Sequence, residues 1–527
     1  MTNDDITIIE PTATNVKYSG FECFFAWFSL LGGYLFCRAL PADKNPLGMF
    51  LVAFSVLAVT FVALIVKGVR FNASSIVSAL ISAILSAAIF ISADSFAQLL
   101  AFCGSVMGYS YFVYSACGNK LQRGMSDMIC VDFFKALILL PFSAFGRVWV
   151  AMFSGKRVGG KMLLKVLLGI AIAVVPTVTV ISLLSYDDSF SKILSDIFAF
   201  FRGFKLFSHL FSLAMGGLVA MYIFGMYSAC VNRKLYVGID EFFCGNAYQN
   251  THFIPTVTVA VALLPLVAVY VIFFISQWNY YISAFSGVLP EGLTYAEYAR
   301  SGFFELCSVS AINILILALS AFFTKRKGKG DTALLKTANI LISVMTLVLI
   351  ATAFSKMAIY VQSYGLTAKR VIASWFMVLL ALVFVLIILK QFINRLKLIP
   401  ASGIVVAAMV MLLTLSNYNG IIADYNVDKY ISGDLDSVDV HALYDLGTPA
   451  LPAILRYAEH YEAETGAKIK ENVIDESDFS ELKEDEAAYY TVYCIRGLKG
   501  RLERKSLFTA FSVPDIVAQK AIEDYIN

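Results

Sequence analysis

Charged side chains are scarce in this chain of 527 residues. Asp, Glu, Lys and Arg make up 15% of the residues and hydrophobic residues 59%, whereas a soluble globular domain has roughly 25% charged and 45–50% apolar residues. The uncharged stretches form repeated apolar runs of about 18–23 residues, the length needed to cross a hydrocarbon core of roughly 30 Å. The composition excludes an ordinary soluble domain and predicts a polytopic membrane protein.

Paired cysteines and clustered histidines are also missing. The nine cysteines form no Cys-x-x-Cys pair and lie mostly inside apolar runs, which argues against a disulfide framework or a zinc site. They are interpreted as small apolar packing residues. The four histidines, His209, His252, His441 and His460, have no metal-ligand spacing. We expect no metal and no cofactor.

Two segments resemble known ligand-binding motifs but lack residues that those motifs require. Gly155–Lys161 has the spacing of a phosphate-binding loop, but Met162 stands where Ser or Thr is needed and no strand precedes it. Asp434, Asp436 and Asp439 resemble part of a calcium loop without its glycine and distal Glu, so helix capping by Asp436 is the simpler interpretation. Nothing resembles a nucleophile elbow. Whether the protein is an enzyme stays open, and we lean against it.

The apolar runs predict an all-α fold of about eleven transmembrane helices in residues 21–416. The predicted spans are 21–38, 47–66, 74–93, 96–116, 162–184, 206–227, 254–276, 302–323, 334–356, 370–390 and 399–416.

Lys and Arg gather in alternate short loops, after the second, fourth, sixth, eighth and tenth spans. By the positive-inside rule, one orientation satisfies all five loops. It places the N-terminal tail, residues 1–20, in the cytoplasm and residues 417–527 outside. Arg38 and Lys44, on the opposite side, are the exceptions.

Two loops are predicted to be more than connectors. Residues 131–153 are apolar but interrupted by Asp132, Lys135 and Pro141, so their apolar pieces are too short to span. They are interpreted as helices that lie on the cytoplasmic interface or dip into it. Residues 187–205 have apolar residues at helical spacing and are interpreted as an amphipathic helix on the outer surface.

Residues 417–527 differ from the rest of the chain in charge. They contain 11 Lys and Arg against 21 Asp and Glu, a net charge of −10, so the remainder carries +13. The pattern predicts a small acidic helical domain outside the membrane, with helices at Pro452–Tyr461 and Glu484–Lys505. Glu471–Glu486 reads as an exposed acidic connector, and the lone thiol of Cys494 is expected to be buried.

The stretch from Thr294 to Arg370 concentrates ionisable residues near one membrane surface. Thr294 and Glu297 have capping-box spacing, so a helix is predicted from about Tyr295 to about Phe323. At 1.5 Å per residue this helix is longer than the hydrocarbon core. Gly365 is expected to end one helix and Thr367 to cap the next.

These helices are expected to hold a polar cluster at the outer interface. Its candidate residues are Tyr298, Arg300, Ser301, Glu305, Lys356, Tyr360 and Arg370. The functional interpretation is a site in which Lys356 or Arg370 keeps Glu305 ionised. The alternative is a structural ion-pair cluster, or cations that reach for lipid headgroups, and we prefer the structural reading.

Several segments carry a family resemblance. YARSGFFEL (298–306), YGLTAKR (364–370), the Trp375–Phe376 pair, IIADYNVDKYISGDLD (421–436) and LGTPALPAIL (446–455) stand in the C-terminal half. They resemble the bacterial membrane-protein family called domain of unknown function 4173, itself similar to the 4153 family. The resemblance implies a bacterial cell-membrane location and supplies no catalytic residue.

Three functions are compatible with these observations. The first is a non-enzymatic envelope scaffold, sensor or partner subunit acting through its outer face, with membrane lipids and another envelope protein as partners and no nucleic acid. The second is a transporter of a small solute or lipid, although span centres carry almost no charge. The third is a membrane enzyme on lipid-linked substrates with Glu305 as base.

Overall fold

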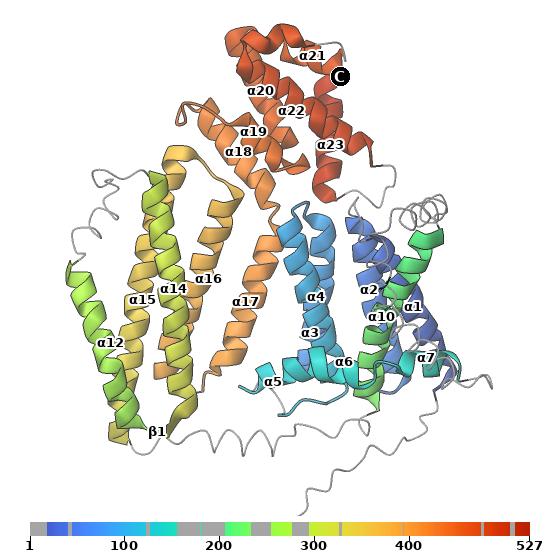
Figure 1. The fold of residues 1–527 in the computed structure, drawn as a ribbon, viewed down its shortest axis with the longest axis vertical. Helices are drawn as coiled ribbons and strands as arrows, with labels where there is room; N and C mark the ends of the chain where they lie inside the picture. The colour runs from blue at the N-terminus through green and yellow to red at the C-terminus, as the bar shows by residue number, and fades with distance from the viewer. Residues whose placement is uncertain are drawn as a thin grey trace, which may run out of the picture. The chain divides into compact units, whose positions relative to one another are not determined.

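The computed structural model is almost entirely helical. It describes residues 18–39, 45–122, 127–154, 176, 180, 206–232, 254–276, 295–325, 329–393, 395–475, 479–505 and 512–527. Two short strands, β1 (Ile254–Pro255) and β2 (Thr324–Lys325), pair in parallel. All other regular elements of the described residues are helices (Figure 1).

Within the described residues, ten helices are long and apolar enough to cross a membrane. They are α1 (Gly20–Ala39), α2 (Pro46–Val66), α3 (Ala73–Ile91), α4 (Ser95–Ala116), α10 (Leu206–Val231), α12 (Thr256–Ser276), α14 (Tyr295–Phe323), α15 (Lys329–Tyr364), α16 (Ala368–Phe392) and α17 (Leu398–Leu415). Each coincides with a predicted span. The predicted span 162–184 and the predicted surface helix 187–205 lie outside the described residues, apart from residues 176 and 180.

Two helices extend well past the hydrocarbon core. The predicted start of α14 near Tyr295 and its end near Phe323 are confirmed. α15 runs over 36 residues, Lys329–Tyr364, which is longer than the predicted 334–356. Hydropathy marks the part of a helix that hydrocarbon surrounds, whereas backbone hydrogen bonds continue into the polar flanks. At 1.5 Å per residue α15 is roughly 54 Å long.

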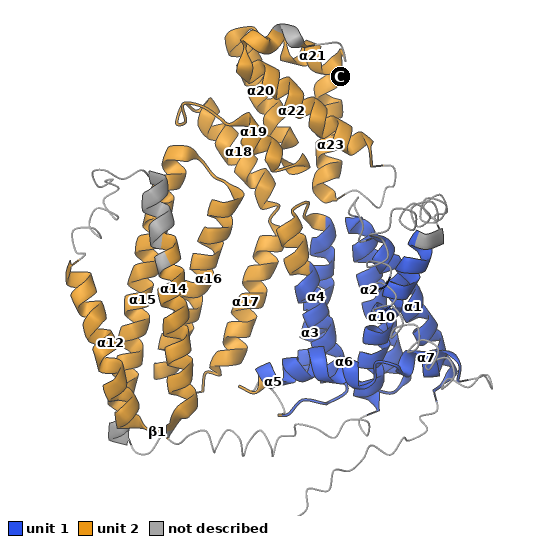
Figure 2. Cartoon of the chain, viewed as in Figure 1, with its two compact units in different colours: residues 1–90, 102–121, 130–238 blue, residues 91–101, 122–129, 239–527 orange. Residues whose placement is uncertain are grey.

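The chain divides into two compact units (Figure 2). Unit 1 comprises Met1–Phe90, Phe102–Leu121 and Cys130–Gly238. In it α1 packs closely on α10, where Gly33 faces Gly216 and a Cβ on either glycine would overlap the backbone of the other helix. Small residues allow such close approach between membrane helices, whose association depends on packing rather than on water exclusion.

The loop predicted at 131–153 forms short helices in unit 1. They are α5 (Ile129–Phe134), the π-helix η1 (Lys135–Leu139), α6 (Leu140–Ser143) and α7 (Arg147–Met152). None is long enough to span. The buried Asp132 carboxylate anchors them to the end of α4, since it accepts hydrogen bonds from the Tyr114 hydroxyl at 2.6 Å and the Leu121 amide at 3.1 Å. Their position on or in the interface stays a prediction.

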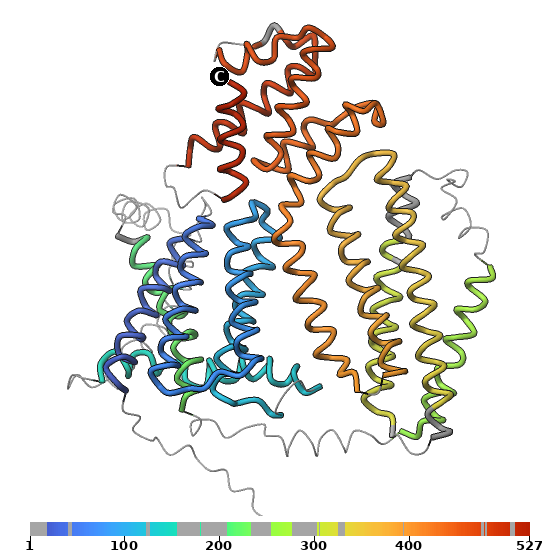
Figure 3. Tube along the Cα trace, turned by 180° about the vertical axis from the view of Figure 1, so that it is seen from behind, coloured from blue at the N-terminus to red at the C-terminus, as the bar shows by residue number. Residues whose placement is uncertain are grey.

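Unit 2 comprises Ile91–Ala101, Gln122–Ile129 and Ile239–Asn527. In it α14, α15 and α16 lie side by side, as both views of the chain show (Figures 1 and 3). They share an apolar core with α12, to which Ala260, Leu306, Ile342 and Phe384 contribute.

The residues after α17 form a bundle of short helices, which we call the C-terminal bundle. It consists of α18 (Tyr418–Ile431), α19 (Val440–Asp445), η3 (Thr448–Ala450), α20 (Leu451–Thr465), α21 (Ile469–Ile474), η4 (Ser480–Glu484), α22 (Glu486–Glu503) and α23 (Val513–Ile526). The helices predicted at 452–461 and 484–505 correspond to α20 and α22. Ile454, Val492, Ile495 and Leu498 are fully buried in one apolar core.

One local prediction for the bundle is wrong, and a second is only partly right. Asp439, not Asp436, caps a helix, because its side chain accepts the Ala442 amide at the start of α19. The predicted connector Glu471–Glu486 is largely exposed where the structure describes it, but it includes part of α21 and the η4 turn. Ile469 and Val473, four residues apart, lie in the bundle core, and this apolar pair fixes the segment despite its acidic composition.

Candidate functional site

The predicted polar cluster is only partly within the described residues. Tyr298, Arg300, Ser301 and Glu305 belong to α14 by their backbone, and their side chains lie outside the described part of the chain. Lys356 is buried in α15, 4% exposed, and Tyr360 follows one turn later. The pairing expected for Glu305 therefore stays a prediction.

Arg370 and Tyr360 come together at the junction of α15 and α16. The guanidinium carbon of Arg370 lies 3.8 Å from the centroid of the Tyr360 ring, a cation–π contact. Arg370 also donates to the carbonyls of Tyr364, at 3.0 Å, and Gly365. These carbonyls end α15, where a cation satisfies unpaired acceptors and the negative end of the helix dipole. The contacts of Arg370 are those of a helix-capping residue.

The helix boundaries predicted beside Arg370 are confirmed. Gly365 has a φ of +71°, the left-handed conformation that glycine adopts at helix C-termini. The Thr367 side chain accepts the Arg370 amide at the start of α16.

Asn426 of α18 binds this same junction, a contact that sequence reasoning missed. Its Oδ1 accepts the Leu366 amide at 2.7 Å, and its Nδ2 donates to the Leu366 carbonyl at 2.9 Å. A Cβ on Gly365 would overlap Asn426 Oδ1, so glycine is needed here for close approach as well as for its φ. We call this reciprocal pair the Asn426 clamp. It ties the C-terminal bundle to the α15–α16 junction.

The clamp lies beside an apolar cluster that gathers distant parts of unit 2. Leu413, Tyr418 and Ile422 are buried there with Ala97, and Leu366 and Trp375 pack against them. The Trp375 indole donates to the Met409 carbonyl at 2.8 Å, which fixes α16 against α17. Three of the segments that carry the family resemblance, 364–370, Trp375–Phe376 and 421–436, therefore meet at one junction.

Charged groups hold the C-terminal bundle together. Asp515 is 2% exposed and accepts hydrogen bonds from Lys505 Nζ and Thr448 Oγ1, both at 2.6 Å, and from Ser512. Burial by itself raises the pKa of the Asp515 carboxyl, but these donors outweigh it and hold the pKa below its usual value. Arg456 of α20 bridges Asp424 and Asp428 of α18 at 2.6 and 2.7 Å.

Aromatic rings gather on another part of the bundle, where Tyr444 is half-buried and its neighbours are exposed. The Tyr444 ring of α19 lies between two others. Its centroid is 6.3 Å from that of His441, also of α19, and 6.2 Å from that of Tyr493 of α22. The Arg501 guanidinium carbon stands 4.3 Å from the Tyr444 ring centroid. Tyr490, one turn before Tyr493, is also exposed. We call these five residues the aromatic patch.

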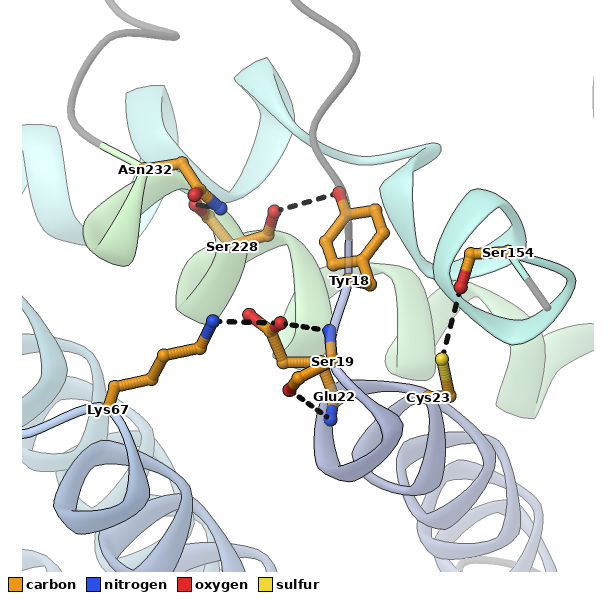
Figure 4. A network of polar contacts seen from close by, with 8 residues as sticks. All are labelled: Tyr18, Ser19, Glu22, Cys23, Lys67, Ser154, Ser228 and Asn232. Atoms are coloured by element: carbon orange, nitrogen blue, oxygen red, sulfur yellow. Dashed lines mark hydrogen bonds and ion pairs between the residues drawn. The ribbon is translucent and has the colours of Figure 1, made fainter.

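A separate polar network lies in unit 1, where α1 begins (Figure 4). Glu22 is 2% exposed; its carboxylate accepts the Ser19 amide at 2.7 Å and pairs with Lys67 Nζ at 2.9 Å. Ser19 Oγ in turn accepts the Glu22 amide, so the two residues form a capping box. This box was not predicted from the sequence, although the Ser-x-x-Glu spacing before an apolar run could have indicated it. The network fixes the start of α1 to the end of α2.

A chain of buried hydrogen bonds joins three membrane helices of unit 2. The Tyr270 hydroxyl of α12 donates to Asn313 Oδ1 of α14, and Asn313 Nδ2 donates to Thr346 Oγ1 of α15, each at 2.7 Å. Asn313 and Thr346 are fully buried. Buried polar side chains in membrane helices serve as interhelical bonds or mark a pathway for polar solutes.

Ten long apolar helices in the described part of the chain, with apolar side chains exposed on their surfaces, are typical of a multi-pass helical membrane protein. Comparison with known families then gives the family. Residues 77–457 match the family described as domain of unknown function (DUF4153), and the chain belongs to it. No curated protein and no solved structure matches the chain.

The match refines the expected resemblance in two ways. It is to the 4153 family, which the sequence segments suggested as the similar one, while the 4173 designation stays a prediction. It also begins in α3, so it extends into the N-terminal half, which the segments did not cover. Of the described residues, no group of three or more His, Cys, Asp or Glu side chains is arranged to hold a metal ion.

Proposed function

We propose that this protein is a non-enzymatic scaffold or partner subunit of the bacterial cell membrane, which receives a second envelope protein on its C-terminal bundle. The supporting observation is the aromatic patch. Tyr490 and Tyr493 are 40% and 49% exposed on a helix with a buried apolar face of its own. Tyr and Arg are the residue types that contribute most to protein–protein binding sites.

The central ring of the patch, Tyr444, is fixed in place by its neighbours. Tyr444 stacks against Arg501 and lies across α22 at Gly497, where a Cβ would come within 2.9 Å of the Tyr444 hydroxyl. Rings that are fixed before binding lose little conformational entropy when a partner covers them. The α19–α22 surface therefore suits a specific protein partner better than a transient contact.

The Asn426 clamp gives a partner a route to the membrane helices. The bundle is bonded through Asn426 to the junction that ends α15 and begins α16. A partner bound to the bundle would be fixed relative to these helices, as a scaffold requires. In a sensor, the same connection would transmit a change in the partner to α15 and α16.

The location of the bundle outside the membrane rests on the charge of the loops. Lys and Arg occupy alternate short loops, which favours a cytoplasmic N-terminus and an extracytoplasmic bundle. We expect Lys520→Cys, at an exposed position of α23, to react with a membrane-impermeant maleimide in intact cells. Native Cys494 is the internal control, because it is fully buried and burial raises its thiol pKa to about 11. Labelling of Lys520→Cys only in broken cells would reverse the orientation.

Partner binding is tested by a photoreactive amino acid placed at Tyr493 in native membranes. We expect one protein adduct, weakened by Arg501→Gln, and none from the same probe at exposed Lys520. No adduct from Tyr493, or equal adducts from both positions, would contradict a partner site. An adduct between two copies of the chain would make the surface a self-association site instead.

Transport is the second candidate, and the Tyr270–Asn313–Thr346 chain favours it. Three hydrogen-bonding side chains meet in the interior of α12, α14 and α15, where a polar solute would need them. Under this hypothesis Asn313→Leu keeps the helices assembled but abolishes uptake of the solute into proteoliposomes. Unchanged uptake would mean that the Tyr270–Asn313–Thr346 hydrogen bonds serve only to hold the helices together.

A further inference from the structure

A groove runs along the surface of unit 1 between α1 and α10. Its volume is about 360 Å³. The residues that line it are Trp27, Leu30, Leu31 and Tyr34 of α1, and His209, Leu210 and Leu213 of α10. On α1 these positions recur at helical spacing and form one face.

The groove is apolar over most of its length. Trp27, Leu31, Leu210 and Leu213 are between 45% and 56% exposed, and they belong to helices long and apolar enough to cross the membrane. Their exposed surface therefore meets hydrocarbon, not water. Since an unfilled hollow loses the dispersion contacts of its lining, the groove favours a flexible apolar chain that can follow it.

One end of the groove is polar. The Tyr34 hydroxyl and His209 Nδ1 are 2.7 Å apart, and the two rings stack. Arg38 lies one turn beyond Tyr34 on α1 and is exposed, with Nη1 donating to Ser208 Oγ at 2.9 Å. The hydrogen bond holds the guanidinium against Ser208, which precedes the lining residue His209, and we take this end as the mouth of the groove.

The charge of Arg38 is unusual for its place in the chain. Glu22, at the start of α1, pairs with Lys67 at the end of α2, so the loop cations Lys67 and Arg70 lie at the opposite end of α1 from Arg38. Arg38 is thus a cation on the side of the membrane that the loop pattern leaves poor in cations. A guanidinium is well suited to bind a phosphate through two parallel hydrogen bonds.

We propose that this groove binds one membrane phospholipid with an anionic headgroup. The acyl chain lies along Leu30, Leu31 and Leu213, and the headgroup phosphate contacts Arg38. Tyr34 and His209 contact the polar region between chain and headgroup. An amphipathic occupant matches a groove with an apolar lining and one polar end. An anionic headgroup matches the positive charge of Arg38.

The test is native mass spectrometry of the full-length protein after reconstitution with equal amounts of phosphatidylglycerol and phosphatidylcholine and removal of loosely bound lipid. Wild type is expected to retain one phosphatidylglycerol in preference to phosphatidylcholine. Arg38→Gln is expected to reduce that preference roughly fivefold, the effect of one cation near an anionic lipid. Arg70→Gln, which removes an exposed cation elsewhere in unit 1, leaves it unchanged.

A second pair of variants tests the groove itself. Leu31→Trp fills it and is expected to abolish retention. Leu35→Trp adds the same ring to an exposed position of α1 outside the lining and retains the lipid. Far-ultraviolet circular dichroism and melting curves establish that both variants fold.

Several outcomes would overturn the proposal. Equal retention of the two phospholipids by wild type removes the role of Arg38. If Leu31→Trp retains as much lipid as wild type, or if wild type retains none, the groove is not a lipid-binding site. A photoreactive group at Leu213 that reacts with another part of the same chain, instead of with lipid, shows that the protein fills the groove itself.

Discussion

The membrane helices of unit 2 and the C-terminal bundle both bury apolar residues, but they expose opposite kinds of side chain. In α14 and α15 Ser310, Asn313, Ser343 and Thr346 are fully buried, while apolar residues such as Ile275 of α12 are up to 71% exposed. In the bundle Ile454 and Leu498 are fully buried and charged residues cover the outside. The difference follows from the surroundings, which are lipid for the membrane helices and water for the bundle.

Each region is stabilised accordingly. Water drives the bundle to bury apolar surface, at about 25 cal/mol for each Å². Lipid offers no such drive between helices, which associate through close packing and interhelical hydrogen bonds. The same substitution should therefore have different consequences in the two regions.

The largest expected effect is in the bundle, at its buried carboxylate. Asp515→Ala leaves the Lys505 ammonium without its buried acceptor, and breaking such a pair destabilises by about 3–5 kcal/mol. Hydrogen exchange of the α23 amides in the full-length protein measures the loss. Asp524→Ala, at an exposed position of the same helix, is the control and should change little. Equal effects of the two variants would mean that Asp515 contributes no more than a surface charge.

The same carboxylate predicts a pH dependence of bundle stability. Its pKa is lowered in the folded protein, because hydrogen bonds from Lys505, Ser512 and Thr448 outweigh the effect of burial. The contribution of Asp515 is therefore complete above the unfolded pKa of about 3.9 and is lost as pH falls through the lower folded pKa. Melting curves between about pH 2 and 6 should show this loss. A curve of the same slope for Asp515→Asn would assign the loss to other groups.

Apolar truncation sharpens the comparison between the two solvents. Leu498→Ala opens a cavity in the bundle core and should cost about 2–5 kcal/mol. Leu315→Ala on α14, where the side chain is 58% exposed, removes lipid contacts only and should change stability by less than about 0.5 kcal/mol. Hydrogen exchange of α22 and α14 reads each region separately. Comparable losses in both would show that the exposed face of α14 is covered by protein.

Breaking the Asn426 clamp, which joins the bundle to the membrane helices, should have an intermediate effect on stability. Gly365→Ala strains a left-handed residue, which costs about 1–2 kcal/mol, and it also displaces Asn426, breaking two hydrogen bonds of about 1 kcal/mol each. Gly433→Ala is the matched control, since Gly433 has a φ of +76° and open space around it. Exchange of the Leu366 amide should rise in Gly365→Ala alone. A rise in both would mean that strain, not the clamp, is responsible.

The smallest effect is expected from an interhelical bond in the membrane. Thr346→Val removes the acceptor of Asn313 while keeping the side-chain shape, and such bonds average about 0.6 kcal/mol. Thr352→Val is the control, because the Thr352 hydroxyl donates to Val348 of its own helix. Unfolding in mixed micelles measures both. A loss of several kcal/mol for Thr346→Val would mean that the polar chain is essential to the packing of α12, α14 and α15.

The membrane helices were predictable because their signal is local. A run of about 20 apolar residues can satisfy its backbone in hydrocarbon only as a helix, and Gly365 and Thr367 mark the ends of α15 and α16 by their own conformational and capping preferences. Asp436 was predicted to cap a helix, but Asp439 does so. Both carboxylates lie within two residues of a valine, and sequence alone gives no ranking between them.

Contacts between distant residues were not predictable in the same way. Asn426 and Leu366 are 60 residues apart, and neither residue type indicates the other. Arg370 was grouped with Glu305 by charge, a pairing that stays a prediction. Among the described side chains and backbone, Arg370 contacts a ring and two carbonyls that charge alone did not indicate. A side chain with several donors takes the partners that its surroundings offer, and those surroundings are a property of the packed helices.

The sequence by itself determined that this protein crosses a membrane many times, where most of its helices lie, and that its C-terminal part is helical and acidic. These follow from composition and from patterns that repeat within one helix. The tertiary structure alone decided that Asn426 clamps the α15–α16 junction, that Asp515 is buried among four donors, and that α1 and α10 leave a groove. Each of these depends on which helices pack together, because a hydrogen bond or a hollow exists only between surfaces that meet.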